Sequence, residues 1–215
     1  MGYAFDPDVL HGLVRAHLDA PFPARIDRVV DAVAARYPAH VVRNEPWLLN
    51  NAGGAMGMMK ILHASPREYL IVFGSPIGTE GHTGRFRADD YFMVLYGEQW
   101  AYTPGELEKR VYRPGDLHHL PRGTAGGYRF PDACFALEYA RGSILSMLPF
   151  GFADTLSSTL DLPTLAATAR TFVRLSAAAA AVRLRRSLGA LRRDAPRDTT
   201  DRSDRAGGGF GPAAP

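Results

Sequence analysis

Short strand-like runs, separated by glycine and proline at short intervals, occupy most of residues 44–150. Apolar and aromatic runs bounded by turn-forming residues are typical of β-strands. The Pro114-Gly115 pair predicts a tight turn between a strand ending at Tyr112 and another ending before Pro121. Many short strands with regular turns predict a mainly β domain, either a barrel or a sandwich. The runs are Tyr69–Phe73, Tyr91–Tyr96, Trp100–Tyr102, Lys109–Tyr112, Gly127–Phe130 and Cys134–Tyr139.

Helical patterns flank this β region on both sides. Apolar residues recur at helical spacing over residues 7–37, with a break at Pro21-Phe22-Pro23 and a stop at Pro38. Residues 143–191 are rich in Ala and Leu, with basic residues on a polar side, which indicates amphipathic helices. Helices packed on the β domain with a solvated face would give the same pattern. We expect an N-terminal helical segment (1–43), a β domain (44–142), C-terminal helices (143–191) and a disordered tail (192–215).

Charge is unevenly distributed along the chain. The net charge is +3, but residues 160–215 carry ten Arg against five Asp, a local net of +5, which leaves −2 for the remainder. A basic C-terminal arm predicts an acidic partner such as an anionic lipid surface. Few aromatic residues are interleaved with these arginines, which argues against a nucleic-acid partner. No uninterrupted apolar run of about 20 residues occurs, so we expect no transmembrane helix, and the N-terminus lacks a signal-peptide pattern.

Glu138 is a lone carboxylate inside the apolar run Cys134–Tyr139. An unpaired buried charge is costly, so such a group finds a partner or takes up a proton, and a protonated carboxyl can act as a general acid. The alternatives are that Glu138 points outward or pairs with an arginine. Asp89 and Asp90 precede the run Tyr91–Tyr96, and only one of them can face the interior of the domain. If Asp90 does, two carboxyls share one apolar cavity; a solvent-exposed strand start is the other interpretation.

Metal and phosphate sites are weaker hypotheses. Histidine and carboxylate side chains on adjacent strands could hold Fe, Mn or Zn. However, the adjacent His118 and His119 point to opposite faces of a strand, so only one can look inward. The glycine-rich stretch Gly74–Arg85 lacks the spacing of a phosphate-binding loop. We therefore expect no metal and no cofactor; the metal ligands considered are His82, His118, His119, Glu80 and Glu138.

Longer motifs make the chain recognisable. They resemble the family of fungal C-8 sterol isomerases and the sigma non-opioid receptor, over about residues 8 to 176. Three further stretches, Ala88–Phe92, Gly97–Gln99 and Leu117–Leu120, look like the isomerase branch rather than the receptor branch. The motifs that carry the resemblance are Asn50–Gly54, Met56-Gly57, Leu62–Ser65, Glu68-Tyr69, Phe73-Gly74, Gly81–Arg85, Glu138–Gly142 and Ala153–Thr159.

The resemblance implies a cupin-like β-barrel whose closed interior holds the ligand. It implies that two C-terminal amphipathic helices cover the barrel and face a membrane, and that the chains form a homotrimer. The location implied is peripheral membrane association, at the endoplasmic reticulum in a eukaryote or at the cytoplasmic membrane face in a bacterium. The receptor's N-terminal transmembrane helix has no counterpart in this sequence.

The activity implied is the movement of a sterol ring double bond from the 8 to the 7 position, through a carbocation. Glu138 matches the family's ligand-binding carboxylate, and Asp90 lies two residues before Phe92, which stands where the receptor has its second carboxylate. We expect Glu138 and Asp90 to be catalytic and a sterol-like molecule to be the substrate. A receptor-like binder without turnover and a metal-dependent cupin enzyme are the alternatives. The expected substrate-binding residues are Tyr69, Phe73, Phe86, Tyr91, Phe92, Trp100 and His119, with Glu68, Glu80 and His82 as structural supports.

Overall fold

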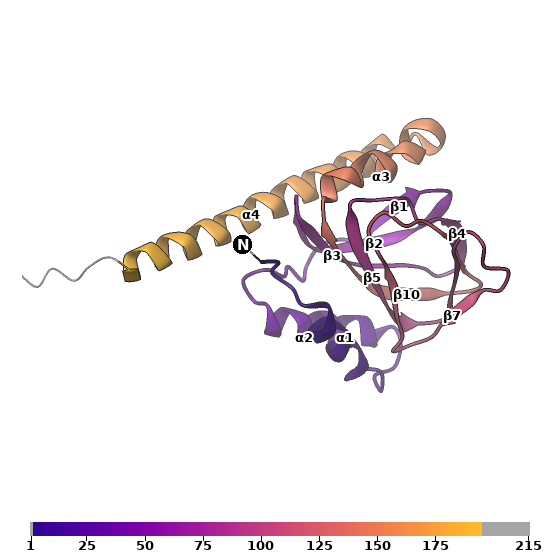
Figure 1. Cartoon of the computed structure of the whole chain (residues 1–215), viewed down its shortest axis with the longest axis horizontal. Coiled ribbons are helices and arrows are strands. Elements are labelled where there is room, and N and C mark those ends of the chain that lie inside the picture. Colours follow the sequence, from indigo (N-terminus) through magenta and orange to yellow (C-terminus); the bar gives the residue numbers. More distant parts are fainter. Residues whose placement is uncertain (1, 195–215) are drawn as a thin grey trace, which may run out of the picture.

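Two short helices open the chain in a computed structural model that describes residues 2–194. Helix α1 (Pro7–Arg15) begins at Asp6, whose side chain accepts backbone N–H bonds from Asp8 and Val9 at 2.9 and 3.3 Å. Helix α2 (Ala24–Arg36) follows, and both helices lie side by side along one face of the β domain (Figure 1). The two helices predicted over residues 7–37 are confirmed.

Within residues 2–194, ten strands form two antiparallel sheets. One has six strands in the order β1-β2-β3-β10-β5-β8, and the other has four in the order β4-β9-β6-β7. A mainly β domain flanked by helices is confirmed, but the expected single closed barrel is wrong for the described residues, because no ladder joins the edge strands of one sheet to those of the other. The strands are β1 (Leu48–Ala52), β2 (Ala55–Ser65), β3 (Glu68–Ser75), β4 (Thr79–His82), β5 (Ala88–Tyr96), β6 (Gln99–Tyr102), β7 (Arg110–Tyr112), β8 (Leu117–Leu120), β9 (Gly127–Phe130) and β10 (Cys134–Gly142).

The sequence pattern missed strands β1, β2 and β4. Strands β1 and β2 form a hairpin whose two-residue loop is Gly53-Gly54, with φ of +64° and +85°. Positive φ at both central residues suits the tight turns that match the strand twist, and glycine adopts it without a steric penalty. In β2 the register shifts between Ile61 and His63, so its apolar residues do not alternate regularly.

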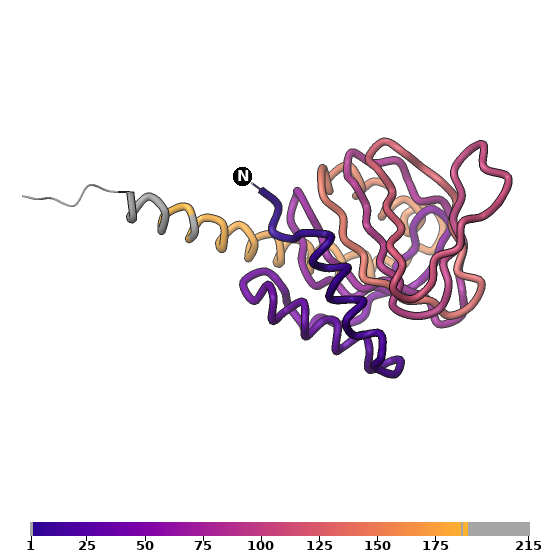
Figure 2. The backbone as a smooth tube through the Cα atoms, turned by 60° about the horizontal axis from the view of Figure 1, so that its bottom comes forward, coloured from indigo at the N-terminus to yellow at the C-terminus, as the bar shows by residue number. Residues whose placement is uncertain are grey.

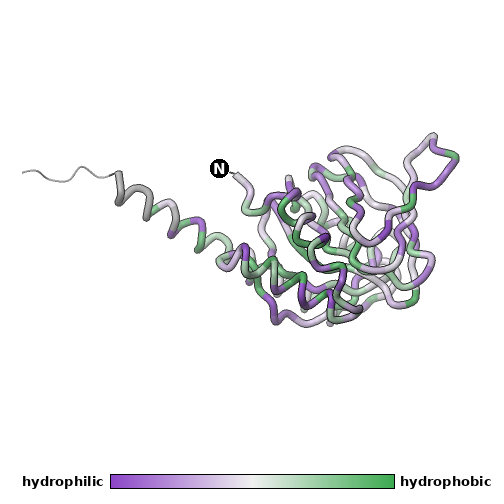
Figure 3. The backbone as a smooth tube through the Cα atoms, turned by 90° about the horizontal axis from the view of Figure 1, so that it is seen from below, coloured by the Kyte–Doolittle hydropathy of each residue, from purple (hydrophilic) through white to green (hydrophobic). Residues whose placement is uncertain are grey.

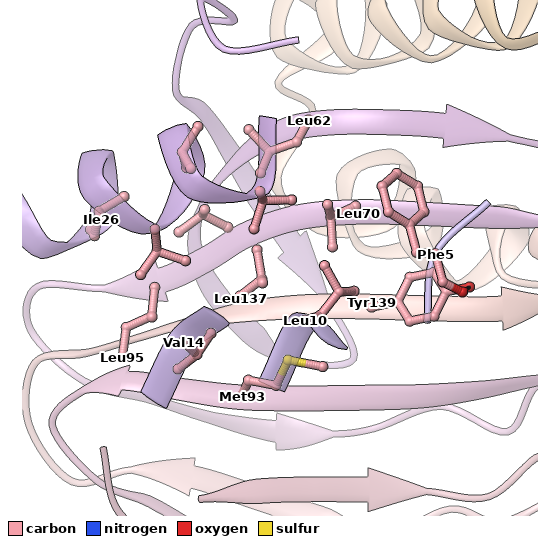
Figure 4. Packing of buried hydrophobic residues seen from close by; sticks show 14 of the residues in the cluster. Phe5, Leu10, Val14, Ile26, Leu62, Leu70, Met93, Leu95, Leu137 and Tyr139 are labelled. Carbon is pink, nitrogen blue, oxygen red and sulfur yellow. Dashed lines mark hydrogen bonds between the residues drawn. The ribbon is translucent and has the colours of Figure 1, made fainter. Parts of the chain in front are cut away.

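Strand β10 is buried on both faces. Its outward side chains, Phe135, Leu137 and Tyr139, pack against residues of α1, α2 and the neighbouring strands, as Figure 4 shows for Leu137 and Tyr139. Its inward side chains are small apart from Glu138, since Cys134, Ala136 and Ala140 alternate with the large outward ones. The small residues leave space above the strand on the side that faces the second sheet.

The C-terminal part contains a short helix and a long helix. A short helix α3 (Leu148–Asp154) follows a 3-10 turn and leads through the π-helical turn Thr155–Thr159 into one long helix, α4 (Leu162–Asp194). Helix α4 packs on β2 and β1 and then runs outward past the domain, as Figures 1 and 2 show.

The stretch Leu162–Arg185 is long and apolar enough to cross a membrane by length and composition, and only 11% of its most apolar window is buried. This differs from the expectation of no such segment. The expected tail lies outside the described residues from position 195 on.

Glu68 joins three parts of the fold although its side chain is fully buried. Its carboxylate accepts the backbone N–H of Ala4 at 2.9 and 3.0 Å and the hydroxyl of Tyr139 at 3.0 Å. It also forms an ion pair with Arg183 of α4, at 2.9 Å. A second ion pair, between Arg174 and Glu45 at 2.5 Å, holds α4 nearer its start. Two of the α4 arginines therefore form ion pairs within this chain and are not free for another partner.

Replacing Glu68 by alanine should lower the free energy of unfolding by about 3–5 kcal/mol, because the change leaves buried donors and a cation without their shared acceptor. Urea unfolding followed by circular dichroism measures this. Glu80→Ala is the matched control, since Glu80 is exposed and reaches only Arg129, at 3.5 Å, and should cost less than about 1 kcal/mol. Equal losses for the two variants would contradict the role of Glu68 as the junction.

Candidate functional site

A mostly apolar cavity lies between the two sheets and under the C-terminal helices. It offers about 210 Å³ of space that the centre of a water molecule can reach. The six-stranded sheet forms one wall and the four-stranded sheet the other. Residues of α3 and α4 cover the end of the cavity beside β1 and β2. The residues that line it are Asn50, Ala52, Met59, Ile61, Tyr69, Ile71, Phe73, His82, Thr83, Phe86, Asp90, Phe92, Gln99, His118, Leu120, Tyr128, Glu138, Ile144, Met147, Leu148, Phe150, Gly151, Phe152, Thr168 and Phe172.

Strand register brings Glu138 and Asp90 to the same wall of this cavity. Glu138 lies directly opposite Phe92 on β5, and Asp90 lies opposite Ala140, one inward position further along β10. Paired residues of neighbouring strands share a face, so the two carboxyls are diagonal neighbours on the inner face. Both line the cavity. The conditional expectation that Asp90 faces inward is confirmed.

The two carboxyls hold protons more strongly than carboxyls in water. Burial raises the pKa of Glu138 from 4.5 to about 7, against the opposing effect of a hydrogen bond donated by the Tyr69 hydroxyl. Burial, followed by the nearby charge of Glu138, raises the pKa of Asp90 well above its ordinary value. Near neutral pH the pair therefore retains at least one proton, because two adjacent buried negative charges are unfavourable.

The surroundings of the two carboxyls differ. Glu138 receives the Tyr69 hydroxyl, which stabilises its charged form. Asp90 has one buried oxygen, Oδ1, with no hydrogen-bond partner among the described residues, so its neutral form is favoured. The site thus contains an acid and a base side by side in an apolar cavity, the arrangement needed to add a proton to a substrate and remove another.

Tyr128 faces this pair from the opposite sheet, and sequence reasoning missed it. It lies on β9 and lines the cavity. Burial, and then the charges of Glu138 and Asp90, raise its pKa, so the phenol stays protonated. The alternation of Tyr128 with Arg129 in the predicted strand was the available signal, since one of them had to face inward.

Gln99 and His118 form a second polar group in the cavity wall. Both are at most 5% exposed, and their side chains are hydrogen-bonded through His118 Nδ1 and Gln99 Oε1 at 3.1 Å. The His118 ring stacks on Tyr112 with ring centroids 4.5 Å apart. Burial lowers the pKa of His118 to about 4, so the ring is neutral at pH 7.

The expected substrate-binding residues divide between the cavity and other surfaces. Tyr69, Phe73, Phe86 and Phe92 line the cavity. The other three, Tyr91, Trp100 and His119, do not. Tyr91 stacks on His119 at 4.4 Å and on Tyr139 at 5.9 Å, on the other face of the sheet. Trp100 contacts the Lys109 ammonium, 3.0 Å from its ring centroid, because its neighbours Gln99 and Ala101 take the inward positions.

The expected supports also take different places. Glu68 is the junction described above, whereas Glu80 is exposed. His82 borders the cavity and accepts the backbone N–H of Gly84 at 2.8 Å, which holds the glycine-rich turn. Within residues 2–194, no three His, Cys, Asp or Glu side chains gather closely enough to bind a metal ion.

The site is thus an apolar cavity that holds two carboxyls with raised pKa values. The chain belongs to the family described as "ERG2 and Sigma1 receptor like protein", whose profile matches residues 1–179. It is 56% identical to the C-8 sterol isomerase of Neurospora crassa over 168 residues, 76% of this chain and 66% of that protein. It is 54% identical to C-8 sterol isomerase erg2 of Aspergillus fumigatus over 172 residues, 78% of this chain and 72% of that protein.

The receptor branch is more distant. Sigma non-opioid intracellular receptor 1 of Gallus gallus is 34% identical over 174 residues, 80% of this chain and 78% of that protein. The chain is therefore C-8 sterol isomerase-like, as its motifs predicted, and it spans about half to three quarters of the length of the isomerases it matches. An RmlC-like cupin from Shewanella frigidimarina overlaps 48% of this chain and 90% of its own, with 18% identity and a TM-score of 0.40, which is too loose to support a functional comparison.

The raised pKa of Glu138 makes stability depend on pH. Between pH 4.5 and about 7 the folded state binds more protons at Glu138 than the unfolded state does. This contribution is fully present below pH 4.5 and is lost as the pH rises through 7, at a cost of up to about 3 kcal/mol. Glu138→Gln should remove this dependence, so that the variant exceeds the parent protein in unfolding free energy at pH 8 but not at pH 4.5. Urea titrations at both pH values measure the difference, and Glu80→Gln, which alters an exposed carboxyl, should leave the profile unchanged.

Proposed function

We propose that this protein is a sterol double-bond isomerase that moves a ring alkene from the 8 to the 7 position. The single observation that carries the proposal is the pair Glu138 and Asp90, sharing protons in an apolar cavity. Protonating an isolated alkene needs an acid held away from water, and the resulting cation needs a nearby negative charge. The identity to named C-8 sterol isomerases, at 54–60%, supports this chemistry for this cavity.

The reaction consists of two proton transfers. Asp90, as the neutral acid, gives its proton to carbon 9 of the 8,9-alkene, and the electron pair of the double bond forms the new C–H bond. The tertiary cation left at carbon 8 lies near the Glu138 carboxylate. Glu138 then removes a proton from carbon 7, and the electrons of that C–H bond form the 7,8-alkene. Substrate and product are isomers, so no redox partner or cofactor is consumed.

The site must then return a proton from Glu138 to Asp90. The two carboxyls are diagonal neighbours, and the raised pKa of each supports such a transfer. Tyr69 donates a hydrogen bond to Glu138, and Tyr128 lies on the opposite wall. The two hydroxyls stabilise whichever carboxylate carries the negative charge, which is Glu138 before the proton transfers and Asp90 after them. Phe92, opposite Glu138, and Phe73, 6.5 Å away ring to ring, offer aromatic faces to the cation.

A non-catalytic binder of sterols or hydrophobic amines is the second candidate. The specific observation in its favour is that Glu138, with its Tyr69 support, is also a suitable partner for a protonated amine in an apolar cavity. An ammonium ion resembles the carbocation in charge and position, so the isomerase should bind such amines as well. Turnover is what separates the two candidates.

Glu138→Gln should lower turnover of a delta-8 sterol at least about a thousandfold and should also abolish binding of a hydrophobic amine, because it removes the charge beside the cation. Asp90→Asn should lower turnover to a similar extent but keep the amine affinity, since it removes only the proton donor. Product analysis by gas chromatography gives the first readout, and amine titration gives the second. Unchanged turnover in both variants, with Glu80→Gln as the control, would refute the mechanism, and absence of turnover in the parent protein would favour the binder.

The C-terminal helices support a second proposal, that the protein lies against a lipid surface. Exposed apolar side chains gather on the segment from Leu145 to Leu188, and in Figure 3 hydrophobic and hydrophilic stretches alternate along α4 where it leaves the domain. Apolar side chains on one side of a surface helix are typical of helices that lie in a membrane interface.

The homotrimer implied by the family resemblance also stays a proposal, which sedimentation analysis in detergent tests.

Replacing Leu156, Val173 and Leu184 by glutamate should reduce co-sedimentation with anionic liposomes about tenfold or more, because each side chain is more than half exposed and would lose its contact with lipid. Leu107→Glu is the matched control, since Leu107 is fully exposed in the loop before β7. The proposed membrane face would be contradicted if only the Leu107→Glu control lost pelleting, or if neither the control nor the triple variant did.

A further inference from the structure

The cavity contains, besides the carboxyl pair, the polar pair Gln99 and His118, to which the isomerisation steps assign no role. His118 Nδ1 donates to Gln99 Oε1, which leaves His118 Nε2 as an acceptor and the Gln99 amide N–H groups as donors. No protein partner for either group occurs within the described part of the chain, and both residues line the cavity. Both functions are open to the cavity, where a ligand that supplies one donor and one acceptor would pair them.

Strand register places this pair at a defined distance from the carboxyls. Glu138 on β10 is opposite Phe92 on β5, which in turn is opposite His118 on β8. His118 therefore lies in the same row as Glu138, two strand spacings or roughly 10 Å along the sheet. Asp90, opposite Leu120, occupies the neighbouring row.

The other end of the cavity has the opposite character. Helices α3 and α4 pack over β1 and β2, at the far edge of the six-stranded sheet from β8. There the lining from these two helices is mostly apolar and comes from Leu148, Phe150, Phe152 and Phe172. Across the strands, the cavity thus runs from an apolar end, past the acid–base pair, to a hydrogen-bonding end.

A sterol has the same three-part order along its length: an alkyl chain, the rings with the alkene, and one hydroxyl on the first ring. We propose that Gln99 and His118 bind the 3-hydroxyl of the substrate, its hydrogen donated to His118 Nε2 and its oxygen accepting from the Gln99 amide. This assignment rests on the proposed function and sets the orientation of the substrate, with the alkyl chain directed to α3 and α4. Gln99 and His118 are specificity residues that anchor one end of the rings while the alkene lies at the carboxyls.

The test compares a delta-8 sterol with its 3-deoxy analogue as substrates and as competitors for a bound hydrophobic amine. The parent protein should prefer the 3-hydroxy compound roughly 10- to 100-fold in kcat/KM, because the analogue leaves both polar groups unpaired. His118→Phe keeps a ring to stack on Tyr112 but removes the acceptor. It should bring the preference to within about threefold by weakening the 3-hydroxy sterol alone, mainly through KM. Gln99→Met should act in the same direction.

Asn50→Leu is the matched control, because Asn50 lines the cavity from β1, near the helices. It should leave the preference for the hydroxyl within about twofold of the parent value. A parent protein without preference, a preference that survives His118→Phe, or a preference lost in Asn50→Leu instead would each overturn the proposal. If no sterol is turned over, the proposed isomerase activity fails, and the amine-competition preference still decides whether Gln99 and His118 bind the hydroxyl.

Discussion

The burial of strand β10 on both faces is the constraint on which the rest of the structure depends. Its outward residues Phe135, Leu137 and Tyr139 form a dry interface with α1, α2 and neighbouring strands, which anchors the strand in the centre of the six-stranded sheet. Its inward residues are small, so the opposite sheet cannot pack closely against it and a cavity remains. Glu138 is the one long side chain on that inner face, and it projects into this cavity.

Two buried glutamates show how partners decide between structure and chemistry. Glu68 is fully buried, yet the backbone N–H of Ala4, a hydroxyl and a guanidinium surround it, so its charge is compensated and it holds the N-terminal segment, β10 and α4 together. Among the described residues, Glu138 accepts a hydrogen bond from the Tyr69 hydroxyl and has a second carboxyl and the Tyr128 phenol nearby, but no cation is paired with it. Incomplete compensation raises its pKa toward neutrality, which suits proton transfer and costs stability at higher pH.

The lining of the cavity changes in character from the helices to β8. The helices supply an apolar end, β10 and β5 supply the acid–base pair, and β6 and β8 supply Gln99 and His118. Because the strands of the sheet are evenly spaced, the positions of these groups relative to each other follow from register. The helices that close the cavity also expose apolar side chains outward, so the same elements lie between the site and the proposed lipid surface.

The sequence by itself determined the helix–sheet–helix order, most of the strands and the family, and it singled out Glu138 as a lone carboxylate in an apolar strand. It could not determine which of two adjacent residues faces the cavity. Alternation places Tyr91 and Phe92, Gln99 and Trp100, or His118 and His119 on opposite sides of a strand, but hydrophobicity does not distinguish the sides where both are covered. Only the pairing register and the packing of α1 and α2 on one face of the large sheet turned Tyr91 and His119 away and brought Asp90, Gln99, His118 and Tyr128 to the cavity.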